Sequence, residues 1–434
     1  MSQPDLTYQN RYMSASLFTF IFIATLAFTM LAKFWLARRH LSYIAAHRDK
    51  VPEAFSKQIS LASHQKGADY TSVKTRFSML SMLFDAVVLL AFTVAGGIQK
   101  IFELSHGWFS SPLMQGMATI VIVLVLSSVL ETPFNLYRTF AIEARFGFNH
   151  MTFKLYLADA LKSLLVGALL GLPLLAGVLW LMGRMGEYWW LYVWGVWVIF
   201  NLLILFIYPT FIAPLFNKFS PLKDEETKAR IEALLKRCGF TSSGLFVMDG
   251  SRRSAHGNAY FTGFGKTKRI VFFDTLLEHL NIEEVEAVLA HELGHFKHHH
   301  VIKRIASTFA ISLVFLWLLG MLMQTSWFYQ GLGVYPSSFG SSGSGQAALA
   351  LLLFFMIMPV FSFLLGPIMS AYSRKHEFEA DSYAVKQTNP GDLINALVKL
   401  YQDNAATLTP DPLYSKFYDS HPPAAVRIAQ LQAA

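Results

Sequence analysis

The chain has 434 residues, of which 54% are hydrophobic and only 15% are charged. This composition lies well outside that of soluble globular domains and predicts a membrane protein. The single cysteine, Cys238, excludes intrachain disulfides and a metal site built from thiolates. The formal net charge of +8 would favour nucleic acid only if the basic residues formed one patch, and they sort by loop instead.

Hydropathy predicts seven membrane spans, each long enough to cross a hydrocarbon core of about 30 Å. No basic stretch precedes the first span and no small-residue cleavage site follows it, so we expect a retained helix and not a cleavable signal. The predicted spans lie at about 17–36, 77–98, 114–130, 163–183 and 188–209, followed by two within 305–373 that a Gly/Ser-rich stretch at 336–346 separates.

The basic residues indicate the orientation of these spans. Of the 36 Lys and Arg residues, 32 fall in the segments 38–76, 131–162, 217–304 and 374–434, which hold 8, 4, 14 and 6 of them. If the spans alternate, these segments share one side, and the positive-inside rule places that side in the cytosol. We therefore expect the N-terminus outside, and anionic lipid accounts for the basic balance without nucleic acid.

The polar segment 217–304 combines strand-like alternation at 244–273 with a helical pattern that carries the motif HExxH. On a helix, His291 and His295 project from the same face, close enough to bind one metal ion. Two neutral imidazoles suit zinc, and a catalytic zinc has three protein ligands and one position open to water. Glu292 beside them is then placed to act as a general base and not as a ligand.

The motif supplies only two ligands, so a third must come from elsewhere. His298 and His299 lie roughly 5 Å beyond His295 along the axis, too far for the same ion if the helix continues. We therefore expect the histidines at 298–300 to form a solvated or headgroup-facing helix end. A metzincin-like third histidine would fall at position 301, which is Val301.

The other candidate for the third ligand follows the seventh span. Glu377 and Asp381 are four residues apart on one helical face, which suits a carboxylate ligand and a second carboxylate that holds a ligand histidine by its other nitrogen. Glu379 would point elsewhere. The alternative, an ordinary charged cap on a membrane helix, is weakened by the nearby HExxH that still needs a ligand.

HELGH at 291–295 and EFEAD at 377–381 together resemble the integral-membrane zinc metalloproteases typified by the type I CaaX prenyl protease. The resemblance covers nearly the whole chain and includes the motifs at 68–77, 131–137, 145–149, 254–264, 411–415 and 420–423. It implies an all-α polytopic fold in which seven transmembrane helices enclose a large chamber. One Zn²⁺ per chain would lie in a cytosolic, gluzincin-like α+β domain.

The resemblance also implies roles for individual residues. Asn258 matches a position that holds the substrate backbone, and His421 and Arg427 match a pair that meets the substrate near the scissile bond and on its C-terminal side. Without the resemblance, Asn258 could equally be a turn residue and His421 a loop anchor. With it, Glu292 and His421 are the expected catalytic residues.

We divide the chain accordingly into five spans with their loops (1–216), a metalloprotease segment (217–304), two further spans (305–373) and a cytosolic C-terminal segment (374–434).

The expected function is zinc-dependent cleavage near the C-terminus of prenylated, CaaX-type tails. The expected partners are such tails and membrane lipid, the expected state is a monomer, and the expected location is a bacterial inner membrane. Two alternatives are a general quality-control zinc protease of membrane proteins without a lipid requirement, and a transporter or channel, which would have no reason to carry HExxH.

Overall fold

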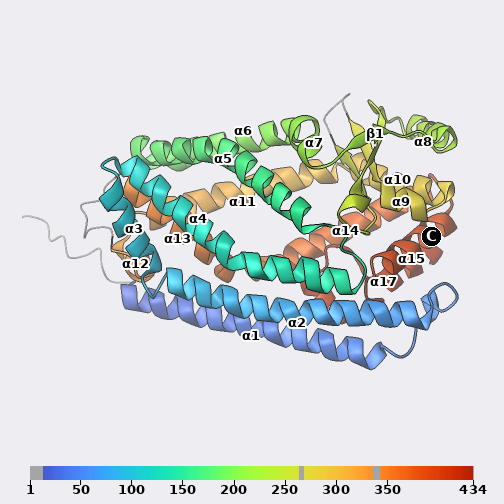
Figure 1. The fold of residues 1–434 in the computed structure, drawn as a ribbon, viewed down its shortest axis with the longest axis horizontal. Helices are drawn as coiled ribbons and strands as arrows, with labels where there is room; N and C mark the ends of the chain where they lie inside the picture. The colour runs from blue at the N-terminus through green and yellow to red at the C-terminus, as the bar shows by residue number, and fades with distance from the viewer. Residues whose placement is uncertain (1–12, 263–267, 336–342, 434) are drawn as a thin grey trace, which may run out of the picture.

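The computed structural model describes residues 13–262, 268–335 and 343–433, which are mostly helical (Figure 1). Within them, seven segments are long and apolar enough to cross a membrane, as the hydropathy predicts. Five of them are the single helices α1 (Ala15–His47), α2 (Leu61–Phe92), α5 (Phe153–Arg184), α11 (His300–Leu322) and α13 (Ser344–Phe361). A sixth consists of α4 (Pro112–Tyr137) and η3 (Arg138–Glu143). The remaining one consists of η4 (Gly186–Tyr188), α6 (Trp189–Ile207), η5 (Tyr208–Ile212) and α7 (Ala213–Phe216).

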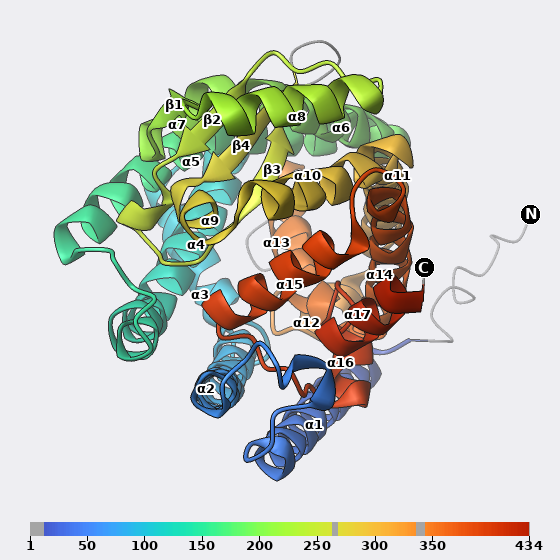
Figure 2. The ribbon, with the colours of Figure 1, turned by 90° about the vertical axis from the view of Figure 1, so that its right-hand side faces the viewer.

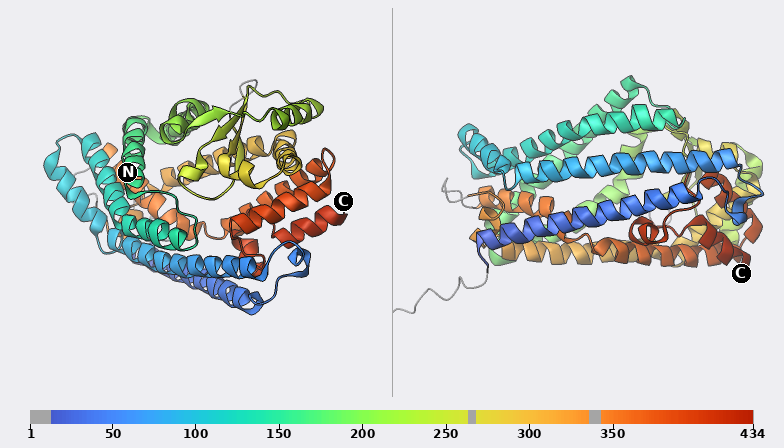
Figure 3. Two further views of the ribbon diagram at one scale, coloured as in Figure 1. Left: turned by 45° about the vertical axis from the view of Figure 1, so that its right-hand side comes forward. Right: turned by 90° about the horizontal axis from the view of Figure 1, so that it is seen from below.

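Several of these helices are longer than the hydrophobic runs within them. The helix α2 already begins at Leu61, capped by Ser60, because the polar stretch before the predicted span at 77–98 is helical as well. A helix of 33 residues such as α1 is about 50 Å long, against a hydrocarbon core of about 30 Å. The helices therefore extend beyond the apolar layer, and α1 and α2 run side by side along one flank (Figure 3).

One end of the helical bundle is closed by two short helices, α3 (Gly97–Trp108) and α12 (Ser326–Gln330), near the start of α1 (Figure 1). Phe22, Phe102 and Phe328 are fully buried here, in an apolar cluster that also includes much of α13. The Gly/Ser-rich stretch that we expect between the last two spans falls mainly on 336–342, outside the described residues.

The opposite end holds a four-stranded sheet of strand order β1-β2-β4-β3. The strands β2 and β4 are parallel, whereas β1 and β3 pair antiparallel with β2 and β4, respectively, so that β3 is an edge strand. Packing of α8 and α10 against this sheet buries a second apolar core that includes Leu234, Phe272 and Leu289. The elements are β1 (Phe219–Pro221), α8 (Glu225–Arg237), β2 (Leu245–Met248), η6 (Gly250–Arg252), β3 (Ala259–Thr262), β4 (Arg269–Phe273), α9 (Asp274–His279) and α10 (Ile282–Lys297).

The C-terminal helices complete this end of the molecule and lie beside α10 (Figure 2). They are α14 (Leu365–Val385), α15 (Pro390–Asp403), α16 (Pro412–Tyr418) and α17 (Ala424–Ala433), with the short η2 (Glu53–Phe55) packed nearby through Phe55. The division points that we place at 304 and 373 fall inside α11 and α14, so these helices run continuously from the apolar bundle towards the sheet-bearing end.

Candidate metal centre

The helix α10 carries the HExxH residues and is firmly anchored at its start. Asn281 caps it by accepting the backbone N–H of Glu284 at 2.8 Å, while the Glu284 carboxylate accepts the backbone N–H of Asn281 at 2.9 Å. This reciprocal capping box satisfies two backbone donors that a helix end otherwise leaves free. Lys399 of α15 binds the same carboxylate at 2.7 Å, so the start of α10 is tied to the C-terminal helices.

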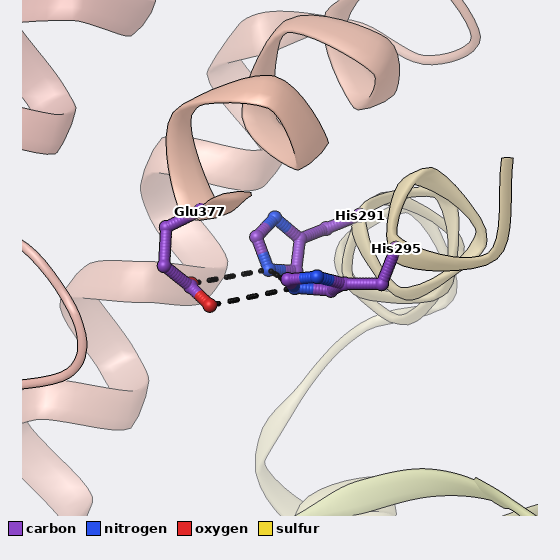
Figure 4. Close-up of side chains that lie close together, drawn as sticks. All are labelled: His291, His295 and Glu377. Atoms are coloured by element: carbon purple, nitrogen blue, oxygen red, sulfur yellow. Dashed lines mark hydrogen bonds and ion pairs between the residues drawn. The ribbon is translucent and has the colours of Figure 1, made fainter. Parts of the chain in front are cut away.

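His291 and His295 of α10 face Glu377 of α14 (Figure 4). The two Nε2 atoms are 3.2 Å apart. The Glu377 carboxylate lies 3.5 Å from His291 Nε2 through Oε2 and 3.4 Å from His295 Nε2 through Oε1. Two imidazole nitrogens of α10 and the carboxylate of α14 thus face one another as a triangle of three side chains, each within 3.5 Å of the other two, although 82 residues separate Glu377 from His295 in the chain.

This triangle fits a zinc ion in both size and charge. Tetrahedral zinc with bonds of 2.0–2.1 Å keeps its ligand atoms about 3.3 Å apart, close to the observed separations. Among the described residues, the buried Oε2 atom of Glu377 finds no hydrogen-bond partner, as expected of an atom placed to bind a cation. Glu292, Glu377 and Asp381 together exceed the positive charge of Arg427, so a cation would offset the remaining negative charge.

Asp381 and Arg427 hold His291 from behind. His291 Nδ1 is 2.8 Å from Asp381 Oδ1, and Arg427 donates from Nε and Nη2 to the two oxygens of that carboxylate at 2.8 and 2.5 Å. Burial alone would raise the pKa of Asp381, but the bonds from His291 and Arg427 outweigh it and lower the pKa to about 2. Asp381 therefore stays an acceptor, which places the proton of neutral His291 on Nδ1 and leaves Nε2 free for a metal.

Arg427 lies in α17, where its side chain is buried and its Nη1 is 3.8 Å from Glu377 Oε2. Arg427, which we expect to meet substrate, thus also contacts the carboxylates of Glu377 and Asp381. His421 precedes α17 and is more open: 60% of its side chain is exposed, and its Nε2 lies 3.4 Å from Glu377 Oε1.

Burial raises the pKa of Glu292, which brings this carboxylate closer to the neutral range where a general base works best.

Asn258 lies immediately before the edge strand β3. Its side chain accepts the backbone N–H of Ala259, and its carbonyl accepts the backbone N–H of Phe273. These contacts hold the residue at the rim of the sheet, and its hydrogen bonds within the described chain do not reach the metal-centre residues.

A cavity of about 760 Å³ adjoins the metal centre at His421. Residues of α2, η3, α15 and α16 also line it, including Tyr70, Glu143, Tyr401 and Tyr418. The cavity is large enough for a short peptide segment.

Of the histidines at 298–300, which we expect to form a solvated helix end, His299 is exposed but His300 is not. His299 adopts a left-handed conformation with φ of 57°, which ends α10 and turns the chain into α11. His300 is consequently buried at 4% exposure beside His295, where it binds Glu379. Our prediction assumed an unbroken helix, whereas the turn at His299 brings His300 back. The available signal was the run of three histidines at 298–300, which begins three residues after the end of HExxH.

The chain matches two family models along almost its entire length. Residues 40–218 match a model described as CAAX prenyl protease N-terminal, five membrane helices, and residues 221–434 match peptidase family M48. The CAAX prenyl protease 1 homolog of Mus musculus is 32% identical over 461 residues, which cover 95% of this chain and 96% of that protein. CAAX prenyl protease 1 of Saccharomyces cerevisiae is 32% identical over 402 residues and 88% of both chains.

The crystal structure of S. mikatae Ste24p superposes with a TM-score of 0.87 at 30% identity and covers 97% of this chain and 100% of that chain. The likeness extends over both the membrane helices and the sheet-bearing end, so the resemblance inferred from the motifs is confirmed. The alternative of a transporter or channel loses its support. The chain belongs to peptidase family M48, as a multi-pass membrane metalloendopeptidase of the CAAX prenyl protease 1 type.

Proposed function

We propose that this protein uses one zinc ion to cleave peptide bonds near the C-terminus of prenylated, CaaX-type substrates. The observation that carries the proposal is the triangle of the side chains of His291, His295 and Glu377, whose nearest ligand-type atoms lie 3.2 to 3.5 Å apart, as in a tetrahedral zinc site. The names of the relatives support the substrate class, because those proteins are described as CAAX prenyl proteases.

The side chains around this triangle have distinct roles in the proposed reaction. Zinc, when bound, would supply Lewis acidity that lowers the pKa of water and polarises the scissile carbonyl. Glu292 takes the proton of the attacking water and passes it to the leaving amine. His421 donates a hydrogen bond to the oxygen that becomes negative in the transition state. Asp381 orients His291, and Arg427 holds Asp381.

The proposed substrate is an extended tail that enters the cavity beside His421. Asn258, at the start of the edge strand β3, holds the substrate backbone, because an edge strand offers unpaired N–H and C=O groups to an added strand. An enclosed site of this kind admits a flexible tail and excludes folded domains. Membrane lipid and the substrate tail are the proposed partners, and the protein acts as a monomer.

We also propose that the N-terminus and α3 lie outside and the metal centre lies in the cytosol. The distribution of 32 of 36 basic residues supports this orientation, as does the position of the sheet and of α14 to α17 at the end opposite α3 (Figure 1). The bacterial inner membrane stays a prediction, and the relatives named above are eukaryotic.

A peptide panel tests the proposed activity directly. Matched peptides ending in a CaaX sequence, with and without a farnesyl group on the cysteine, are incubated with purified protein, and the N-termini of the products are identified. We expect metal-dependent cleavage after the lipidated cysteine and much slower cleavage of the lipid-free peptide. Equal cleavage of both peptides, at scattered positions, would favour the general quality-control protease. Zinc-loaded protein that cuts neither peptide contradicts both.

A further inference from the structure

A second hydrogen-bonded chain of side chains reaches the metal centre behind His295. His295 Nδ1 lies 2.9 Å from His300 Nδ1, and His300 Nε2 lies 2.8 Å from Glu379 Oε2. The three residues come from α10, α11 and α14, which meet here. His300 is buried, whereas Glu379 keeps 31% of its side chain exposed.

Metal binding by His295 allows only one arrangement of protons along this series of hydrogen bonds. If Nε2 of His295 faces the metal position, its proton sits on Nδ1 and is donated to His300 Nδ1. His300 then carries its own proton on Nε2 and donates it to Glu379, whose carboxylate only accepts. Each ring is thereby held in a single tautomer. The arrangement parallels the direct bond between His291 Nδ1 and Asp381 on the other side of the metal position.

His376 restricts the remaining freedom of the His300 ring. The two rings stack with centroids 3.9 Å apart and an interplanar angle of 10°. A nitrogen lone pair lies in the plane of its ring, so two parallel stacked rings direct their lone pairs past each other and not at one ion. His300, His376 and Glu379 are therefore poorly arranged to bind a metal of their own, although their ligand atoms lie close together.

We propose that His300 and Glu379 are positioning residues that fix the tautomer and orientation of His295 for zinc binding. The proposal rests on the zinc site of the proposed function. It differs from that function in its consequence, because it predicts that residues outside the ligand set control how tightly the metal is held. Mutation of the hydrogen-bond partner of a metal-bound histidine typically lowers metal affinity or activity by about 10- to 100-fold.

Four variants of the full-length protein separate the hydrogen bonds from the packing. His300→Phe keeps a ring against His376 but removes both hydrogen bonds. His300→Asn keeps an acceptor near the position of Nδ1. Glu379→Ala removes the carboxylate that accepts from His300 at the end of the hydrogen-bonded series. His376→Phe is the matched control, because it preserves the stack and none of its hydrogen bonds in the described structure reaches His295. Zinc affinity is measured by competition with a chelator, and the Co²⁺-substituted protein gives an absorption spectrum that reports ligand geometry.

We expect His300→Phe to bind zinc roughly 10- to 100-fold more weakly, with an altered Co²⁺ spectrum, and Glu379→Ala to be weakened by at least several-fold. His300→Asn should recover most of the affinity, and His376→Phe should match the wild type. Wild-type zinc affinity and spectrum in His300→Phe would overturn the proposal, as would an equal loss in His376→Phe. If His300→Phe does not fold, unchanged affinity in Glu379→Ala would overturn it.

The metal stoichiometry provides a further check. We expect one zinc per wild-type chain and per His376→Phe chain. Two ions in the wild type and one in His376→Phe would overturn the proposal by assigning a metal to the second cluster. A wild-type protein that binds no zinc would instead contradict the proposed function itself.

Discussion

Gly294 of α10 packs directly against the backbone of Ala380 in α14. A Cβ added at Gly294 would stand 2.8 Å from the Ala380 Cα. Real Cβ atoms do not approach backbone this closely, so any side chain at position 294 forces the two helices apart. The contact lies between the helices that carry the proposed metal ligands. The absence of a side chain at Gly294 therefore sets the spacing of His291 and His295 from Glu377.

Gly294→Ala should consequently weaken both the fold and the metal site. Overpacking of this kind typically costs about 1–3 kcal/mol, and separating the helices widens the ligand triangle. Thermal unfolding in detergent and zinc affinity are the measurements. Gly177→Ala in α5 is the control, because a Cβ there meets no atom of the described part of the chain within 4 Å. Equal zinc affinity in the wild type and Gly294→Ala would show that the spacing is not limiting.

Glu292→Ala should leave zinc bound while peptide cleavage falls by several orders of magnitude. The side chain is assigned to proton transfer and not to metal binding, and losing a general base costs roughly 10²- to 10⁴-fold. Metal content and the rate of peptide hydrolysis are measured on the same sample. Near-wild-type cleavage by a fully zinc-loaded Glu292→Ala protein would remove the assignment.

Glu377→Ala should lose zinc during dialysis, because it removes the carboxylate that closes the ligand triangle. Glu232→Ala on the exposed face of α8 is a control for the loss of a carboxylate as such. Metal analysis after dialysis separates the two variants. Retention of stoichiometric zinc by Glu377→Ala would mean that the third ligand lies elsewhere.

Asp381→Ala should weaken zinc binding or activity by about 10- to 100-fold, since His291 loses the acceptor that orients it. Asp381→Asn should have a smaller effect, because the amide oxygen can still accept from His291 Nδ1. Zinc competition assays rank the two variants against the wild type. A ranking in which Asp381→Asn is as defective as Asp381→Ala would indicate that charge pairing with Arg427 matters more than the bond to His291.

Cysteine labelling should place Glu103 and Glu187 outside and Lys416 in the cytosol. Single Glu103→Cys, Glu187→Cys and Lys416→Cys changes are made in a Cys238→Ser background, which removes the only native thiol. In intact cells, a membrane-impermeant reagent should modify the first two sites and reach Lys416→Cys only after permeabilisation. The opposite pattern would reverse the orientation and would make exported proteins the substrate pool.

His421→Ala should retain zinc while the turnover number falls by roughly 10²- to 10³-fold, the usual cost of one oxyanion donor. Its Nε2 is 3.4 Å from the Glu377 carboxylate, close enough to reach substrate at the metal but not needed to complete the ligand triangle. Separate measurement of kcat and KM distinguishes transition-state stabilisation from substrate binding. A change confined to KM would reassign His421 to binding.

The amino-acid sequence by itself determined the features that depend on short-range periodicity. The seven spans follow from the length of apolar runs, the proposed orientation rests on the distribution of basic residues, and the shared faces of His291 with His295 and of Glu377 with Asp381 follow from a spacing of four on a helix. These properties are local, so neighbouring residues are enough to specify them.

Only the tertiary structure decided which side chains meet across elements. Arg427 reaches Asp381 because α17 packs beside α14, and His300 reaches His295 because the backbone reverses at His299. The first contact joins residues 46 positions apart, and the second depends on a left-handed residue that hydropathy does not reveal. Periodicity assigns a residue to a face of its own helix. Which element packs against that face depends on the close packing of helices that are distant in the sequence, such as the contact between Gly294 and Ala380.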